Sequence, residues 1–371
     1  MSKSKSKIVF FTRNKPDDTL AQYQRIQKLM SLFNKAFEKD VVLFNTYDES
    51  LSHSKLILKS KKKIKAYLKA IKYKIDSIVI DTLDPWSIAY LNRYALKRNI
   101  KVYIDIVEYA DPKEKKFGYL SPSLLLNHRV IKHSVKKNMK VIAISSFFTS
   151  YYDRKGIKSV LIPNMINEED DYSNNVKKRL TDKVHFIFAG YPQKKDALDV
   201  TMQAMIALNK QYPDHFCFHI AGLNEEEFFE KYKKLKKNRK EIQSFTAFHG
   251  FVRREAIKSL YYKSDFSIIM RDPSMKVCQS GFPTKFSESL SFARPVISNL
   301  TSDIGLYLTH KMNGYVVTGF NKESLLTTLK LALEKKAHRK EMFANAYECA
   351  KRFFSPSMYI ERLRGTEDVQ K

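Results

Sequence analysis

The chain has 371 residues, enough for two α/β domains, and its content of 43% hydrophobic and 13% aromatic residues excludes a disordered chain. Its formal net charge of +28 predicts a polyanionic neighbour, such as an anionic membrane surface or a nucleic acid. No segment approaches the roughly 20 consecutive apolar residues that a membrane-spanning helix needs.

Strands and helices are expected to alternate through the first 165 residues. The first apolar run, Ile8–Phe11, is too short for the core of a signal peptide, so we expect the protein to remain in the cytoplasm. Buried apolar strands separated by helices are typical of a parallel, doubly wound sheet. The expected strands are 8–11, 41–44, 77–80, 102–107, 141–144 and 160–162, and the clearest helices are 19–37, 85–97 and 122–137.

A basic amphipathic helix is predicted between the second and third strands. Residues 55–74 contain nine lysines and no acidic residue, interleaved with an apolar stripe at roughly helical spacing. Such helices bind anionic membrane surfaces, and our hypothesis is a peripheral association with the inner face of the cell membrane. The alternative is a solvated helix of a lysine-rich protein, whose apolar side belongs to the core.

A polar segment without periodicity then separates two halves of the chain. We expect a first domain at 1–165, a linker at 166–182 that includes the acidic run Glu168–Asp171, and a second domain at 183–354. The second domain repeats the alternation of strand and helix. Its expected strands are 184–190, 216–221, 246–248, 266–270, 296–298 and 315–317.

The segment 281–299 carries the most information about function. It predicts a loop, a short helix, a break at Arg294-Pro295 and a buried strand. Lys285 and Glu288 are three residues apart and share one helical face, which suits a nucleotide diphosphate: the cation for phosphate and the carboxylate for ribose hydroxyls. The alternative is an ion pair on a surface helix.

This segment resembles the donor-binding motif of retaining glycosyltransferases with the GT-B fold, in glycosyltransferase family four. The family has two glutamates eight positions apart; Glu288 matches the second, and Ser280 stands where the first is expected. The amino-acid sequence of residues 281–285 resembles that of a subgroup of these enzymes encoded in bacterial surface-polysaccharide gene clusters. The resemblance implies two Rossmann-like domains facing a central cleft, with a last helix at 355–371 that packs back on the first domain. The donor-binding residues that it implies here are Ser280, Gly281, Phe282, Pro283, Thr284, Lys285 and Glu288.

Three further cations are candidates for the diphosphate. Gly190 ends the first strand of the second domain, and a glycine turn before a helix exposes backbone N–H groups to phosphate. Lys195, or Lys194, matches a lysine that the family places after this glycine. Arg271 follows the strand 266–270 and could contact the diphosphate, or it could pair with a neighbouring aspartate.

The loop His249-Gly250-Phe251 follows the next strand and is expected beneath a pyrimidine base. Backbone recognition of a base needs no particular side chain, so His249 could equally be a structural histidine.

Two acids are candidates for catalysis. Asp105 and Glu108 lie at the carboxyl end of a strand of the first domain, near the place where family members carry a histidine that contacts the donor sugar. Glu108 could receive the acceptor proton or stabilise a developing oxocarbenium charge. The alternative is an exposed loop acid paired with Lys113 or Lys115. Asp84 is a further candidate with less support.

We expect no bound metal and no cofactor besides the nucleotide sugar, because no His, Cys or Asp group has the spacing of metal ligands along the sequence. The three cysteines are odd in number and widely spaced, so they are interpreted as reduced and without a role. They are Cys217, Cys278 and Cys349.

The sequence therefore predicts a metal-independent, retaining hexosyl- or N-acetylhexosaminyltransferase. It would move a sugar from a donor such as a UDP-sugar to a hydroxyl of a lipid-linked glycan, in capsule or cell-wall polysaccharide synthesis. The alternatives are a nucleotide-sugar epimerase of the same fold, a non-catalytic GT-B scaffold subunit and a basic nucleic-acid-binding protein. Against the last, the basic runs lack interleaved stacking aromatics.

Overall fold

The computed structural model describes residues 6–17, 20–50, 53–167, 173–177, 181–334 and 338–366. The chain forms two compact units. The first comprises Met1–Met165, Ser280–Phe282 and Pro356–Lys371, and the second comprises Ile166–Gln279 and Pro283–Ser355. Among the described residues, no helix combines the length and apolar character needed to cross a membrane.

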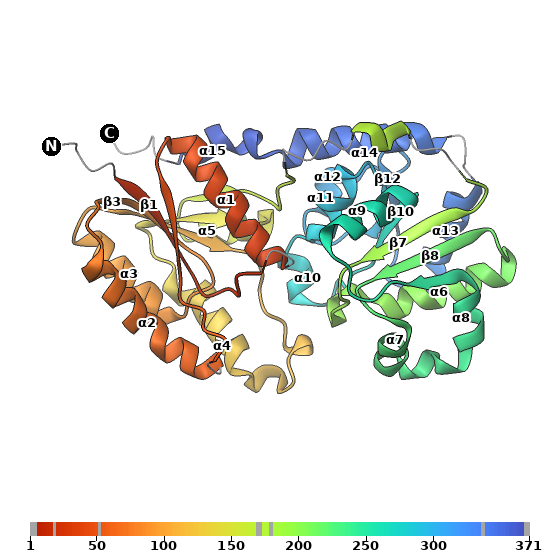
Figure 1. Ribbon diagram of the computed structural model, residues 1–371, viewed down its shortest axis with the longest axis horizontal. Coiled ribbons are helices and arrows are strands. Elements are labelled where there is room, and N and C mark those ends of the chain that lie inside the picture. The colour runs from red at the N-terminus through yellow and green to blue at the C-terminus, as the bar shows by residue number, and fades with distance from the viewer. Residues whose placement is uncertain are drawn as a thin grey trace. The chain divides into compact units, whose positions relative to one another are not determined.

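The first unit is built on a parallel six-stranded sheet with helices on its faces (Figure 1). Its strand order is β2-β1-β3-β4-β5-β6, which is the doubly wound arrangement that the sequence predicted. The central strands are almost entirely buried, which explains why they appear in the sequence as continuous apolar runs. The strands are β1 (Lys7–Thr12), β2 (Val41–Asn45), β3 (Ile75–Ile80), β4 (Lys101–Ile106), β5 (Met139–Ala143) and β6 (Ser159–Leu161).

Helices from both ends of the chain cover this sheet. Tyr359 and Leu363, near the C-terminus, join the core formed by β1 and α1, and Arg364 Nε donates a hydrogen bond of 2.7 Å to the carbonyl of Ala36. The C-terminal segment therefore packs on the first unit. The helices are α1 (Ala21–Phe37), α2 (His53–Ala70), α3 (Pro85–Leu96), α4 (Pro122–Arg129), α5 (Ser146–Asp153) and α15 (Ile360–Arg364).

The basic helix is α2, and its apolar side faces the core of the first unit. Ile64 is fully buried and Leu68 is nearly so, whereas Lys61, Lys62 and Lys65 are exposed. Ile64 and Leu68, among the described residues of the stripe, are therefore unavailable for insertion into a bilayer, whereas the exposed lysines can meet an anionic surface. The side chains of residues 55–58, which belong to the predicted stripe, lie outside the described part.

The second unit repeats the plan with the strand order β12-β11-β10-β7-β8-β9, again all parallel. Successive side chains of its strands point to opposite faces of the sheet. Phe186 and Phe218 belong to the core cluster on one face, and Ile187 and Ala221 belong to another cluster. The strands are β7 (Val184–Ala189), β8 (Phe216–Ala221), β9 (Thr246–Phe248), β10 (Phe266–Ile269), β11 (Val296–Asn299) and β12 (Gly314–Val317).

Nine α-helices surround the described part of the second sheet. They are α6 (Leu198–Gln211), α7 (Glu225–Lys231), α8 (Arg239–Phe245), α9 (Arg254–Lys263), α10 (Lys276–Ser280), α11 (Thr284–Ser291), α12 (Ile304–Tyr307), α13 (Lys322–Glu334) and α14 (Arg339–Phe354).

Two sequence-based boundaries differ from the structure. The helix expected at 122–137 ends at Arg129 and continues only as a wider turn over Val130–Ser134. The described part of the expected linker packs on the second unit, because Asn175 donates to the carbonyl of Phe292 and accepts from Arg294. The acidic run 168–171 lies outside the described residues.

Polar side chains at the carboxyl ends of the first unit's strands form a buried network. Asp81, after β3, accepts hydrogen bonds of 2.7 Å from Thr12 and Asn14 and of 3.0 Å from Thr82. Burial, followed by the nearby carboxylate of Asp105, raises the pKa of Asp81, Thr12, Thr82 and Arg25 lower it, and the net result is a pKa of about 7.

This shift makes Asp81→Asn a test of the buried network. Between pH 4 and 7 the unfolded chain loses the Asp81 proton while the folded chain keeps it, so the wild-type free energy of unfolding falls as pH rises. The asparagine variant lacks this term. The free energy of unfolding of the variant minus that of wild type should therefore increase between about pH 5 and about pH 7.5, by up to about 1.4 kcal/mol per pH unit. The difference between the two melting temperatures should change in the same direction. A difference that stays constant with pH would contradict the assignment.

Candidate donor-binding site

The ends of β7 and β8 approach each other so closely that only glycine fits. A Cβ on Gly222 would lie 2.5 Å from the carbonyl carbon and oxygen of Gly190, and both glycines have positive φ, +132° and +97°. The Gly190 N–H donates to Ala221, and the Gly222 N–H donates to Gly250, each at 2.7 Å. Three strand-end loops are thus packed together at the carboxyl edge of the sheet, which is where open α/β sheets bind ligands.

Lys285 crosses over this edge and pairs with Asp196. Its Nζ lies 2.8 Å from Asp196 Oδ1, and a Cβ on Gly190 would come within 3.3 Å of Lys285 Cε. The ammonium group also lies 4.0 Å from the centroid of the Phe188 ring. Asp196 is held by the N–H of Gln193, which donates to Oδ2 at 2.8 Å. The pair is therefore fixed between α11 and the short turn Lys194–Asp196.

The electrostatics of this pair show a surplus of positive charge. Burial lowers the pKa of Lys285, Asp196 opposes this effect, and Lys195 and Arg271 lower the pKa further. Burial opposes ionisation of Asp196, but Lys285 and the N–H of Gln193 outweigh it and hold the pKa of Asp196 below its ordinary value. Three cations and one carboxylate thus share this edge, an arrangement suited to a dianionic or trianionic group.

Arg271 is positioned by its backbone rather than left free at the surface. Its N–H donates to Asn299 Oδ1 at 2.9 Å, and Asn299 Nδ2 donates to its carbonyl at 2.7 Å, which joins the ends of β10 and β11. The guanidinium donates to the carbonyl of Val277 at 3.3 Å. Arg271 is buried, so its guanidinium is enclosed by the protein and not exposed to solvent.

Glu288 lies one helical turn beyond Lys285 and is half-buried. It lies close to Tyr261 of α9: burial, and then the Glu288 carboxylate, raise the pKa of Tyr261 well above its ordinary value. The Tyr261 ring stacks on Phe292 at 4.6 Å between centroids. The carboxylate therefore lies beside a stacked aromatic pair.

The remaining donor-site candidates of the second unit are placed as follows. Lys194 is exposed and Lys195 is half-buried. Pro283 caps α11 and Thr284 begins it. Phe251 is exposed, while the His249 ring contacts His219 at 3.1 Å, and burial, followed by the charge of Lys263, lowers the pKa of His249.

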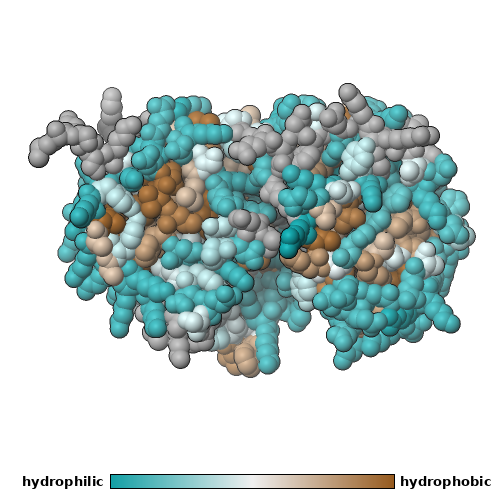
Figure 2. Space-filling model, viewed as in Figure 1, coloured by the Kyte–Doolittle hydropathy of each residue, from teal (hydrophilic) through white to brown (hydrophobic). Residues whose placement is uncertain are grey.

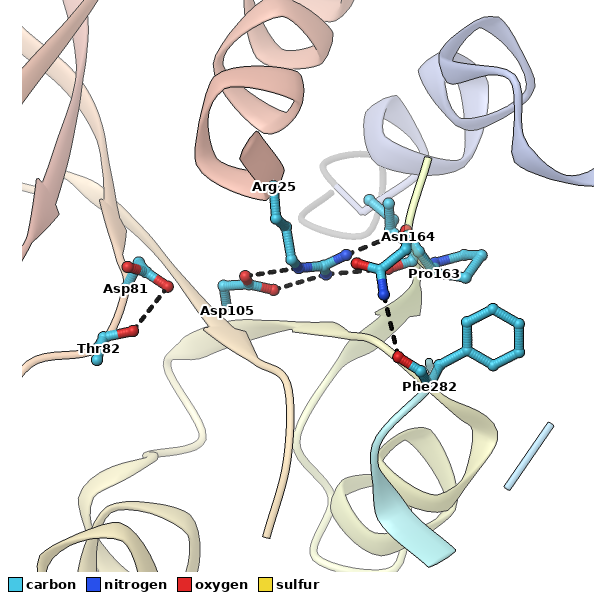
Figure 3. Close-up of polar contacts among 8 residues, drawn as sticks. Arg25, Asp81, Thr82, Asp105, Pro163, Asn164 and Phe282 are labelled. Atoms are coloured by element: carbon cyan, nitrogen blue, oxygen red, sulfur yellow. Dashed lines mark hydrogen bonds and ion pairs between the residues drawn. The ribbon is translucent and has the colours of Figure 1, made fainter. Parts of the chain in front are cut away.

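The segment Ser280–Phe282, expected in the second domain, belongs to the first unit. Its hydrogen bonds explain this difference. Ser280 Oγ accepts from the N–H of Tyr109 at 2.9 Å, its carbonyl accepts from Ser145 Oγ, and the Phe282 carbonyl accepts from Asn164 Nδ2 at 3.0 Å (Figure 3). The partners come from the loops after β4, β5 and β6. Ser280 and Gly281 are buried, and the Ser280 hydroxyl is an internal hydrogen-bond acceptor.

Asp105 is the acceptor of a buried bidentate ion pair. Arg25 Nε and Nη2 each donate to its carboxylate at 2.8 Å, and the same guanidinium donates to the carbonyls of Ile162 and Pro163 (Figure 3). Both partners are about 5% exposed. This geometry joins α1 to β4 and to the segment after β6, and it gives Asp105 a positioning role.

Glu108 is the more accessible of the two acids. It is half-buried after β4, and its backbone carbonyl accepts a hydrogen bond of 3.2 Å from Asn127. Asp84, the weaker candidate, is buried at the start of α3 and accepts from the N–H groups of Trp86 and Ser87 and from the Ser87 hydroxyl. Asp84 is thus a helix cap.

Sequence reasoning missed several partners. Asp196 and Arg25 were not singled out, because their partners are distant in the sequence. It also missed a group of His185, Cys217 and His219, each of which offers a ligand atom within 4.8 Å of the others. The pairing of His185 with Cys217 on neighbouring strands was the available signal, but it depends on the sheet register.

Comparisons with known proteins agree with this geometry. Residues 170–349 match the family model described as Glycosyl transferases group 1. A glycosyltransferase from Rickettsia africae is 17% identical, with a TM-score of 0.71 and coverage of 98% of this chain and 97% of that one. The sucrose-phosphate synthase of Thermosynechococcus elongatus is 13% identical, with a TM-score of 0.70 and coverage of 97% and 98%.

The chain has the GT-B fold. Anabaena HepE in complex with UDP-glucose is also similar, at 14% identity and a TM-score of 0.68, with coverage of 97% of this chain and 98% of that one. A search of curated proteins found no match. The family match includes β7, Lys285 and Glu288, and together with the fold it supports a GT-B glycosyltransferase.

The close approach at Gly222 gives a test of the site. Gly222→Ala places a Cβ against the Gly190 backbone, so the β7 loop must move and carry Lys194–Asp196 with it. We expect at least a tenfold loss of nucleotide affinity, measured by calorimetry. Gly305→Ala is the matched control, because a Cβ there meets only Leu300 at 3.7 Å. Equal affinities for Gly222→Ala and wild type would contradict the placement of the ligand at this edge.

Proposed function

We propose that this protein transfers a hexose or N-acetylhexosamine from a UDP-sugar to a hydroxyl of a lipid-linked glycan, with retention of configuration, during synthesis of a bacterial surface polysaccharide. The observation that supports it most is the Lys285–Asp196 pair with Lys195 and Arg271 at the carboxyl edge of the second sheet. The family match to the same part of the chain adds support, and a similar protein, HepE, has been crystallised with UDP-glucose.

In this proposal the cations act mainly on the leaving group. Negative charge grows on the diphosphate as the bond to the sugar breaks, and we assign Lys285, Lys195 and Arg271, which lie together at this edge, to the stabilisation of that charge. The first N–H groups of α11 add a partial positive charge. The acceptor oxygen forms its bond to the anomeric carbon on the same face from which the diphosphate oxygen departs, and a leaving phosphate oxygen takes the acceptor proton, so the configuration is retained. No divalent metal is required in this scheme, because the side-chain cations supply the charge.

Glu288 and Glu108 have separate roles in the proposal. Glu288 accepts hydrogen bonds from the ribose hydroxyls, one helical turn from the phosphate-binding lysine. Glu108 stabilises the positive charge that develops on the sugar. Asp105 holds the end of β4 through Arg25 and keeps the following residues in place.

Replacement of Glu288 tests the donor site. Glu288→Gln removes the charge and keeps the size, and it should weaken binding of UDP by about tenfold or more, since hydrogen bonds to charged groups contribute roughly 1.5–3 kcal/mol. Calorimetry measures the dissociation constant. Glu323→Ala, an exposed acid in the first turn of α13, is the control and should bind as wild type. An unchanged dissociation constant in Glu288→Gln would remove Glu288 from the ribose site.

The first unit, which we propose binds the acceptor, is proposed to associate with the inner face of the cytoplasmic membrane. Hydrophilic residues cover most of the face in Figure 2. Lys59, Lys61, Lys62, Lys65 and Lys69 of α2 are exposed, and the segment 117–125 of the same unit exposes four large apolar side chains. These are Phe117, Tyr119, Leu120 and Leu125, between 56% and 82% exposed. Lysines bind anionic lipid headgroups and exposed aromatic and aliphatic side chains enter the interface.

Charge reversal tests this membrane contact. Lys61, Lys62, Lys65 and Lys69, changed together to Glu, should release the protein from anionic liposomes at low salt, an effect of several kcal/mol at about 1 kcal/mol per charge. The same reversal at the exposed Lys233, Lys234, Lys236 and Lys237 of the second unit changes the net charge equally and should leave binding intact. Sedimentation with liposomes measures both. Equal release by the two variants would show that only net charge matters.

A further inference from the structure

Three imidazoles form a row across the second sheet. His185 Nδ1 lies 3.0 Å from His219 Nε2, and His219 Nδ1 lies 3.1 Å from His249 Nε2. The rings of His185 and His219 are nearly parallel, with an angle of 10° between them and 5.2 Å between centroids. His185 is the second residue of β7, His219 lies within β8 and His249 follows β9, so the row depends on the parallel register of the three strands.

Cys217 completes this group. It pairs in register with His185 and lies two residues before His219, so all three side chains point to the same face of the sheet. One donor atom from each lies within 4.8 Å of the others. His219 is buried, His185 and Cys217 are half-buried, and Cys217 is in no disulfide.

Two imidazole nitrogens and one thiolate are characteristic ligands of Zn²⁺ and similar transition metals, whereas Mg²⁺ and Ca²⁺ prefer oxygen. With Zn–N bonds of about 2.0–2.1 Å, two nitrogens in a tetrahedral site lie roughly 3.3 Å apart. The observed His185–His219 separation of 3.0 Å needs to open by only a few tenths of an ångström. Water or an exogenous ligand would take the fourth position.

The third histidine provides the support that metal ligands usually have. A histidine that binds a metal through one nitrogen generally holds a polar partner with the other, which orients the ring. His219 meets this condition, because its Nδ1 faces His249 while its Nε2 faces His185.

We propose that His185, Cys217 and His219 form a binding site for a divalent transition metal such as Zn²⁺, with His249 as the positioning partner of His219. The competing explanation is a proton shared along a row of neutral histidines, which produces similar nitrogen–nitrogen distances without any metal. None of the three ligands belongs to the cation group around Lys285, so metal binding is tested separately from sugar transfer; only the positioning partner, His249, is also a donor-site candidate.

Cobalt titration distinguishes the two explanations. Chelator-treated full-length protein is titrated with Co²⁺, whose tetrahedral thiolate complexes absorb in the near ultraviolet and visible. We expect one equivalent of Co²⁺ to bind and to produce absorption bands in both the near ultraviolet, from the thiolate, and the visible. We also expect Zn²⁺ to displace the bound Co²⁺. Cys217→Ser should lose the thiolate band and bind at least tenfold more weakly, and His185→Gln should also bind at least tenfold more weakly. His249→Asn should keep the band with 10- to 100-fold lower affinity, the loss usual for an outer partner.

Matched controls lie in the same unit. Cys349→Ser keeps a donor for the carbonyl of Tyr307, and His215→Gln changes a histidine two residues before Cys217 whose ring contacts the Pro213 carbonyl. Both should bind Co²⁺ as wild type. A second readout needs no variant: Zn²⁺ should slow alkylation of Cys217 in the folded wild type, followed by mass spectrometry. Absence of the thiolate band in wild type, its persistence in Cys217→Ser, or unchanged Cys217 alkylation with Zn²⁺ would each overturn the proposal.

Discussion

The close approach of the β7 and β8 ends is the constraint on which the candidate site depends. Without a side chain at Gly222, the two loops pack against each other, and the turn Lys194–Asp196 is carried to the point where Lys285 can reach it. The ion pair then fixes the start of α11, which also bears Glu288. One steric condition thus influences the positions of Lys285 and Asp196, which come from different parts of the chain, and of Glu288 on the same helix as Lys285.

Much of the fold follows from the sequence because parallel strands are buried on both faces. Runs such as Ile78–Ile80 and Ile268–Met270 appear as uninterrupted apolar segments, and each is followed by a polar residue at a carboxyl end. That pattern led to Arg271, whereas Lys285 and Glu288 were predicted from their helical spacing and the family resemblance. The partners of these residues were harder to predict. Asp196 lies 89 residues from Lys285, and its role depends on which strand ends become neighbours.

Register-dependent features were also missed for a physical reason. His185, Cys217 and His219 come together only because β7 and β8 are aligned so that His185 faces Cys217, and no sequence spacing reveals this. The segment Ser280–Phe282 was assigned by continuity with α11, but hydrogen bonds from Tyr109, Ser145 and Asn164 attach it to the first unit. Likewise the apolar side of α2 supports the core, a distinction that amphipathicity alone cannot make.

The central claim is that the second unit binds a nucleotide diphosphate sugar at the carboxyl edge of its sheet. Thermal unfolding of the wild-type protein with a panel of UDP-, GDP- and ADP-sugars tests it most directly. A ligand at about 100 times its dissociation constant adds about 2.7 kcal/mol to the free energy of unfolding, so at least one nucleotide sugar should raise the melting temperature. Nucleosides without phosphate should not do so at equal concentration. The account would be contradicted if no nucleotide sugar raised the melting temperature, or if nucleosides alone did so equally.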